Sequence, residues 1–138
     1  TELSQFNGEV VFEGIIDCSE KCLANGIPVG LGTDTGCPFI THYDMWRELV
    51  YFHKYCGVSN KFALYTATKR NAEIAHIDDI TGTVEPGKCA DLIVTDANPI
   101  DDLKTLRNVK MVMARGHLIR EPKVKKYENV ERELDKFL

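Results

Sequence analysis

The chain has 138 residues, of which 43% are hydrophobic and 28% charged, and its formal net charge is −4. These values are typical of one globular domain and exclude a disordered chain. Its apolar stretches are far shorter than the ~20 residues of a membrane helix, and it has no basic stripe that could follow a phosphate backbone. We therefore expect no membrane and no nucleic acid among its partners.

Five cysteines are spaced irregularly along the chain. An odd number without a regular framework favours a reducing, cytoplasmic setting. Cys18 and Cys22 lie one helical turn apart, but no second close pair or histidine cluster completes a tetrahedral zinc site. We therefore expect the cysteines to act as small buried hydrophobic residues.

The first predicted elements are a helix followed directly by a strand. Apolar residues recur near a 3.6-residue period over Val10–Asn25, which predicts an amphipathic helix ended by Asn25-Gly26. The short apolar run Ile27–Gly32 then leads to Thr33-Asp34. A continuous apolar run of this kind predicts a buried strand of a parallel sheet or barrel.

The chain is predicted to be helical from about residue 43 to 76. A helix start at Thr41–Asp44 is followed by one apolar stripe, formed by Met45, Leu49, Phe52 and Cys56. After Gly57, Ser59 is placed to cap a second helix and Thr68 a third.

The second half of the chain predicts a small β structure. Glu85–Lys88 has the proline and glycine of a type II turn. Strands are expected over 91–95 and 109–114, with a reversal at Arg115-Gly116 into Leu118-Ile119. A short helical turn is expected at Leu103 and Leu106, and the charged tail is predicted to end in a helix whose narrow apolar face docks on its own domain or on a second subunit.

Asp34 is the sharpest candidate for chemistry, because it stands at the exit of the predicted strand. Ligands and catalytic side chains of barrels and open α/β sheets gather at the carboxyl ends of the strands. A carboxylate there can bind a cation or carry a proton, although it can equally cap a turn. His42 is the one histidine near this loop, and we consider it a candidate substrate-binding residue.

Several segments together resemble the metal-dependent amidohydrolases, in particular the prolidase (Xaa-Pro dipeptidase) and imidazolonepropionase branches. Asn25–Asp34 resembles the last barrel strand of that family, and Thr66–Ala72 is similar to the helical segment after it. Gly82–Val94 resembles the stretch Gly-x-(Ile/Leu/Val)-x-x-Gly-x-x-Ala-Asp-(Leu/Ile), and Val109–Gly116 the closing strand. The segments follow one another in the family's order.

The resemblance implies an α/β fold: the last βα part of a (β/α)8 TIM barrel, followed by strands of a small β-sandwich. The expected divisions are 1–80 for the barrel part, 81–120 for the sandwich part and 121–138 for a C-terminal helix. The implied activity is hydrolysis of amide or other carbon–nitrogen bonds of a small-molecule or dipeptide-like substrate. Asp34 matches the family's aspartate that contacts a divalent metal, zinc by default, and shuttles the proton of the attacking water.

The other metal ligands of the family, a His-x-His pair among them, have no counterpart in this sequence. We therefore expect a fragment that retains no metal and is inactive alone, and that forms homo-oligomers or associates with the missing barrel part. Thr35, Cys37 and Phe39 could border the substrate. Two alternatives stay open: a non-enzymatic interaction module derived from the family, and an unrelated small α/β binding domain in which Asp34 only caps a turn.

Overall fold

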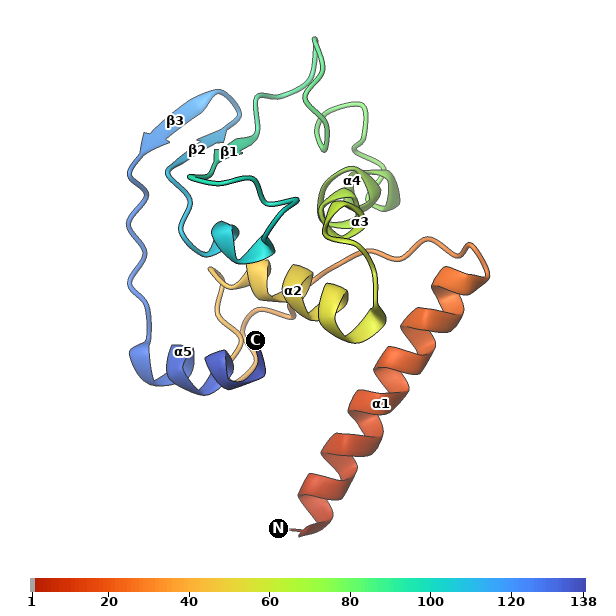
Figure 1. Cartoon of the computed structure of the whole chain (residues 1–138). Coiled ribbons are helices and arrows are strands. Elements are labelled where there is room, and N and C mark those ends of the chain that lie inside the picture. Colours follow the sequence, from red (N-terminus) through yellow and green to blue (C-terminus); the bar gives the residue numbers. More distant parts are fainter. Residues whose placement is uncertain (1) are drawn as a thin grey trace.

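The structure is a computed structural model that describes residues 2–138, with side chains from residue 7 onward. The chain opens with the long helix α1 (Glu2–Ala24), which confirms the first predicted helix. Gly26 ends it with a positive φ of 69°. Figure 1 shows that the N-terminal end of α1 projects away from the other elements. Within the described residues, no helix combines the length and apolar character that crossing a bilayer requires.

Residues 27–33 run in an extended conformation but form no β-strand with another part of the described chain, so the predicted buried strand is not formed here. A parallel strand exists only through hydrogen bonds to neighbouring strands. Exposure nevertheless alternates as in a strand, with Val29, Leu31 and Thr33 half-buried and the residues between them exposed. The segment has the side-chain pattern of a strand and lacks the neighbours.

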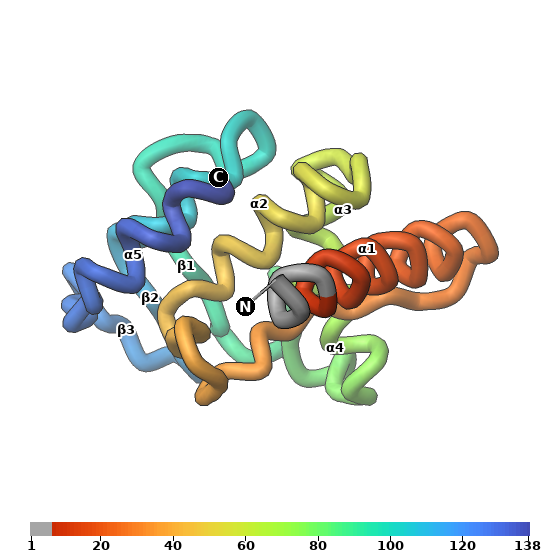
Figure 2. The backbone as a smooth tube through the Cα atoms, turned by 90° about the horizontal axis from the view of Figure 1, so that it is seen from below, coloured from red at the N-terminus to blue at the C-terminus, as the bar shows by residue number. Residues whose placement is uncertain are grey.

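The core forms around α2 (Met45–Cys56) and α3 (Asn60–Tyr65). Its buried side chains are Trp46, Leu49, Val50, Phe52, Ala63 and Leu103. The predicted stripe on α2 is confirmed, Gly57 ends the helix in the left-handed conformation, and the Ser59 hydroxyl accepts a hydrogen bond from the Phe62 N–H at 3.1 Å. Figure 2 shows α2 in the middle of the molecule, between α5 on one side and α1 and α3 on the other.

The helix that begins at Asn60 does not restart at Thr68, so the predicted cap there is wrong. It continues through a π-helical turn, Thr66–Arg70, into α4 (Asn71–Ile74). The Thr68 hydroxyl donates to the Leu64 carbonyl at 2.7 Å. This hydrogen bond gives a partner to a backbone carbonyl in the region where the regular i to i−4 hydrogen bonds of the α-helix are interrupted. A π turn contains one residue more than an α turn and often lies at a functional site.

The second half forms the predicted small sheet, with antiparallel strands in the order β1 (Leu92–Val94), β2 (Met111–Ala114) and β3 (His117–Arg120). Ile93 pairs with Val112, and Val112 with Ile119. The turn at Pro86-Gly87 is confirmed by a bond from the Lys88 N–H to the Glu85 carbonyl at 3.2 Å. A 3₁₀ helix, Leu103–Arg107, is the predicted helical turn.

The tail ends in α5 (Glu128–Leu134) and a 3₁₀ turn, Asp135–Phe137, and it docks on α2 of the same chain. The buried residue of α5 is Glu131, which is 7% exposed, and not one of the apolar residues expected there. The prediction that the cysteines are buried is also wrong for Cys18 and Cys37, which are exposed.

Gly82 is required where the chain leaves α4 and passes close to it. Its φ is 90°, and a Cβ added there would lie 2.5 Å from the Ala72 Cβ. Gly87 has a similar φ of 94° but open space around it. We expect Gly82→Ala to lower the free energy of unfolding by about 2 kcal/mol more than Gly87→Ala does, because only Gly82 adds overpacking to backbone strain. Urea unfolding of both variants measures this difference, and equal losses would show that the contact with Ala72 is unimportant.

Candidate functional site

Asp34 lies at the end of the extended segment 27–33, in a short hydrogen-bonded turn. Its φ is 49°, in the left-handed region. Its carbonyl accepts a hydrogen bond from the Cys37 N–H at 3.2 Å, and the residue is exposed. Among the described residues, the carboxylate takes part in no hydrogen bond or ion pair of the side chains. The carboxylate is therefore presented to solvent at the end of the segment that resembles a strand.

His42 is exposed in the same loop, and its ring stacks edge-on against Tyr43 with centroids 5.5 Å apart. Cys37 and Phe39 are exposed as well, and Phe39 has a φ of 65°. The hydroxyls of Thr33 and Thr35 are hydrogen-bonded to each other at 2.6 Å. These residues share the loop with Asp34, but in the part of the chain that the structure describes no hydrogen bond joins the side chains of Asp34 and His42.

No group of three or more His, Cys, Asp or Glu side chains gathers within the described residues in a way that could hold a metal ion. Zinc in proteins normally takes three or four protein ligands. One exposed carboxylate, Asp34, does not fit that requirement, so these residues do not by themselves form a metal site.

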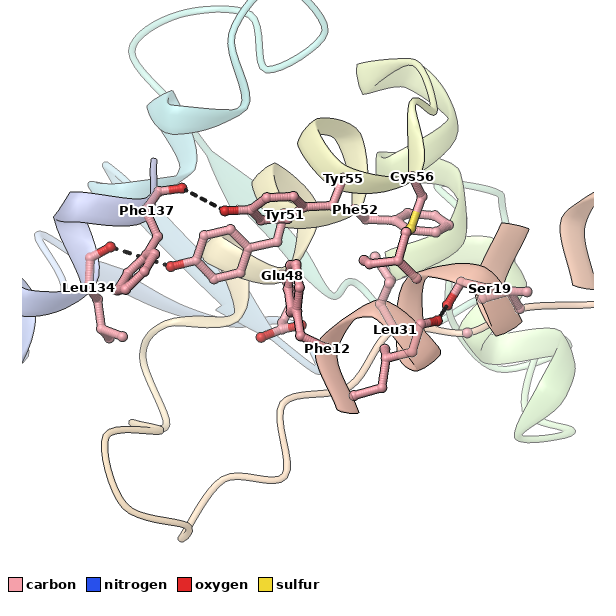
Figure 3. Close-up of a pocket in the computed structure, with 14 residues that line it drawn as sticks. Phe12, Ser19, Leu31, Glu48, Tyr51, Phe52, Tyr55, Cys56, Leu134 and Phe137 are labelled. Atoms are coloured by element: carbon pink, nitrogen blue, oxygen red, sulfur yellow. Dashed lines mark hydrogen bonds between the residues drawn. The ribbon is translucent and has the colours of Figure 1, made fainter. Parts of the chain in front are cut away.

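An apolar cavity of about 540 Å³ opens beside the extended segment, between α1 and α2. Figure 3 shows Phe12 of α1, Leu31 and the α2 residues Glu48, Tyr51, Phe52 and Tyr55 around it, with Leu134 and Phe137 of the tail at one end. The tyrosine hydroxyls of Tyr51 and Tyr55 donate to the backbone carbonyls of the tail.

Glu48 is the acidic residue in the lining of this mostly apolar cavity. Burial, and then the negative charge of Asp34, raise the pKa of Glu48 above its ordinary value of 4.5. Sequence reasoning missed Glu48 because the cavity that it lines is formed only when α1 and the tail pack beside α2.

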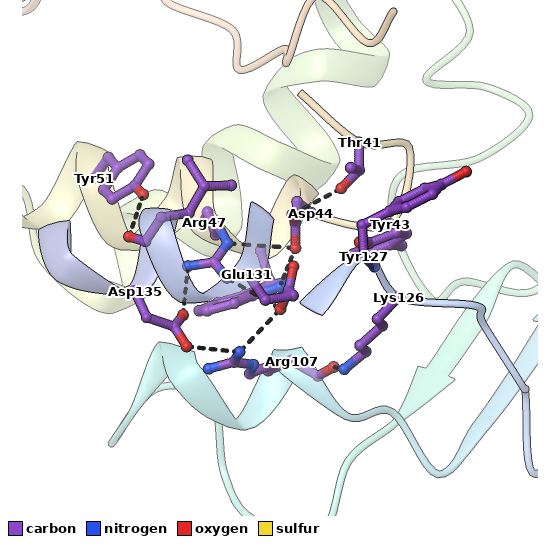
Figure 4. Close-up of polar contacts among 12 residues, drawn as sticks. Thr41, Tyr43, Asp44, Arg47, Tyr51, Arg107, Lys126, Tyr127, Glu131 and Asp135 are labelled. Atoms are coloured by element: carbon purple, nitrogen blue, oxygen red, sulfur yellow. Dashed lines mark hydrogen bonds and ion pairs between the residues drawn. The ribbon is translucent and has the colours of Figure 1, made fainter. Parts of the chain in front are cut away.

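A polar cluster around Arg47 of α2 anchors the tail. Arg47 is 2% exposed, and its guanidinium forms ion pairs with Glu131 at 3.1 Å, Asp135 at 2.9 Å and Asp44 at 3.4 Å. Arg107 joins Glu131 and Asp135, each at 2.9 Å. Figure 4 shows these groups converging between α2, α5 and the 3₁₀ helix. Every charge of the cluster has a partner of opposite sign, which is the arrangement of a structural clasp.

Asn71, at the start of α4, contacts the extended segment directly. The Leu31 N–H donates to Asn71 Oδ1 at 2.9 Å, and Asn71 Nδ2 donates to the Leu31 carbonyl at 2.8 Å. The sequence placed Asn71 in a helix but gave no indication of this contact, because the two residues are 40 positions apart.

The chain is similar to several known proteins. A Bifidobacterium longum structure named as a prolidase is 38% identical and covers 99% of this chain with a TM-score of 0.94. The structure of a Xaa-Pro dipeptidase with methionine bound in its active site is 36% identical over 77% of this chain, with a TM-score of 0.69. The imidazolonepropionase of Picrophilus torridus is 47% identical over 88 residues, which are 64% of this chain.

The chain spans only part of these relatives: 33% of the Bifidobacterium longum protein, 25% of the dipeptidase and 21% of the imidazolonepropionase. The model of the amidohydrolase family matches residues 6–119, which include most of α1, the Asp34 loop, α2 to α4 and nearly all of the sheet. This match overturns the alternative of an unrelated small binding domain, in spite of the local turn at Asp34. The chain belongs to the amidohydrolase family.

Proposed function

We propose that this chain is the part of a metal-dependent amidohydrolase that supplies the last strand of the barrel and its catalytic aspartate. The reaction is hydrolysis of a carbon–nitrogen bond in a small, dipeptide-like substrate. The observation that carries the proposal is Asp34, an exposed carboxylate at the exit of an extended, unpaired segment, within a chain that matches the family over residues 6–119.

Asp34 acts in this proposal as the proton carrier. Its carboxylate accepts a proton from the attacking water and returns it to the nitrogen that leaves, so that one group serves both halves of the reaction. His42 lies on the substrate side of the same loop. The left-handed backbone at Asp34 supports the proposal, because a strained residue with an exposed functional side chain is common at active sites.

A divalent metal bound at the completed site would make water a stronger acid by lowering its pKa. The residues described here offer Asp34 alone toward it, so the remaining ligands would have to come from outside this chain. Zinc is the default choice for the histidine-rich sites of the family.

The proposed organisation divides the chain at residues 80 and 120. Residues 1–80 complete a barrel, 81–120 contribute to a small β-sandwich, and 121–138 are the C-terminal segment that contains α5. Support comes from the apolar surface that the chain leaves uncovered: on α1, Val11 is 61%, Phe12 46% and Ile15 57% exposed. Surfaces of this kind pack against further protein, and we propose that the rest of the barrel or a second copy covers them.

The test compares the full-length protein that contains this sequence with the 138-residue chain. We expect the full-length protein to hydrolyse Xaa-Pro dipeptides or a related carbon–nitrogen substrate, to lose the activity with a chelator and to regain it with a divalent metal. The chain alone should neither bind stoichiometric metal nor turn over substrate, since it brings one ligand where three or four are usual. Metal analysis by mass spectrometry and a hydrolase screen provide the measurements. Stoichiometric zinc and turnover by the chain alone would refute the proposal.

A further inference from the structure

Asn71 holds the extended segment in the way a neighbouring strand would. Its side-chain amide both accepts from and donates to Leu31, at 2.9 Å and 2.8 Å. A paired residue in a sheet makes the same two bonds with a backbone partner. The contact is partly buried, and it joins α4 to the segment that ends at Asp34.

Gly30 allows this close approach. A Cβ at residue 30 would lie 2.7 Å from Asn71 Oδ1 and 3.1 Å from Cδ1 of Ile74. Any larger side chain would therefore push the amide of Asn71 away from Leu31. The contact therefore requires both the amide side chain of Asn71 and the absence of a side chain at Gly30.

The π-helical turn Thr66–Arg70 sets the direction of Asn71. One extra residue in a helix rotates all that follows by about 100° around the axis. The turn lies immediately before Asn71, so the extra residue determines which face of α4 presents the amide to Leu31.

We propose that Asn71 is a positioning residue that fixes the place of Asp34 through Leu31. Within the described residues, the backbone of residues 27–33 is tied by hydrogen bonds at two places, to Cys22 at its start and to Asn71 at Leu31. Leu31 precedes Asp34 by three positions, so of these two contacts the one with Asn71 is the nearer to the carboxylate. The catalytic part of this inference rests on the proposed function, whereas the contact itself does not.

The first test follows the Leu31 amide in the chain itself and needs no activity. We expect Asn71→Ala to raise the hydrogen-exchange rate of the Leu31 N–H at least tenfold, because its partner is lost. Asn60→Ala is the matched control. Asn60 likewise begins a helix and donates to a backbone carbonyl, that of Ile100 at 3.0 Å, away from the Asp34 loop. An unchanged rate at Leu31 in Asn71→Ala would overturn the inference.

The second test measures kinetics in the full-length enzyme. Asn71→Ala should lower kcat by about 10- to 100-fold with little change in KM, because a small displacement of a catalytic group slows the chemical step. Asn60→Ala should leave kcat unchanged. Gly30→Ala keeps the asparagine but displaces it, and should reproduce the kcat loss, so the test survives if Asn71→Ala fails to fold.

A double-mutant cycle separates this inference from the proposed function. If Asn71 acts through Asp34, then Asn71→Ala has no further effect on kcat once Asp34→Asn is present. The same loss in both backgrounds would overturn the positioning role while leaving the role of Asp34 intact. Full activity of Asp34→Asn would refute the proposed function instead, and the exchange result at Leu31 would stand independently.

Discussion

We expect Asp34→Asn in the full-length enzyme to lower kcat by about 10²- to 10⁴-fold, the usual loss when a general acid–base group is removed. Asparagine has nearly the shape of aspartate but cannot take up and return a proton. The backbone should tolerate the change, because asparagine is one of the few residues that adopt the left-handed conformation readily, and Asp34 has a φ of 49°. Steady-state kinetics, with the metal content measured in parallel, test the expectation.

Asp78→Asn is the control for this substitution. Asp78 is exposed and lies after α4, outside the Asp34 loop. Asp78→Asn makes the same chemical change as Asp34→Asn but lies outside the proposed site, so kcat should equal that of the unsubstituted enzyme. A variant with asparagine at position 34, full metal content and unreduced turnover would assign the proton transfer to another residue.

The largest loss of stability is expected at the clasp between α2 and the tail. Arg47→Ala should lower the free energy of unfolding by about 3–5 kcal/mol, because buried Asp44 loses its ion-pair partner and Glu131 and Asp135 are left to share Arg107. Asp44 and Glu131 are 5% and 7% exposed. Arg47→Lys should recover only part of the loss, since an ammonium cannot reach several carboxylates with the geometry of a guanidinium.

Arg132→Ala is the matched control: Arg132 lies on α5, next to the clasp residue Glu131. Its side chain is 70% exposed, and its ion pair with Glu133 spans 3.9 Å. An exposed pair contributes little, so the variant should unfold at nearly the urea concentration of the unsubstituted chain. If both arginine variants lost equal stability, the buried clasp would not be what fixes the tail.

The clasp also predicts the direction of acid sensitivity. Burial alone would raise the pKa of Asp135, but contacts with the Arg107 and Arg47 guanidiniums outweigh it and hold the pKa below the ordinary value of 3.8. A carboxyl group with a lowered folded-state pKa stabilises the protein above its unfolded-state pKa. This contribution is lost as the pH falls through and below 3.8. Asp135→Asn should therefore reduce the acid dependence of unfolding in that range.

The sequence by itself predicted most local structure, because each of these features is determined over a few residues. The spacing of apolar residues predicted α2, and the reversal at Arg115-Gly116 predicted the hairpin of β2 and β3. Pro86-Gly87 predicted the turn before β1. The order of the family's motifs also indicated the amidohydrolase family, which the match to residues 6–119 confirms. The role of Asp34 stays a prediction, carried by that resemblance.

Tertiary structure decided the features whose partners lie far apart in the chain. The run 27–32 has the composition of a buried strand, yet among the described residues it pairs with no other strand, because a strand requires neighbours. Glu131 is buried because Arg47, 84 positions away, neutralises it. The clamp of Asn71 on Leu31 spans 40 positions. Helical periodicity and turn residues act over one or two turns, whereas charge pairing and strand pairing depend on which distant groups the fold brings together.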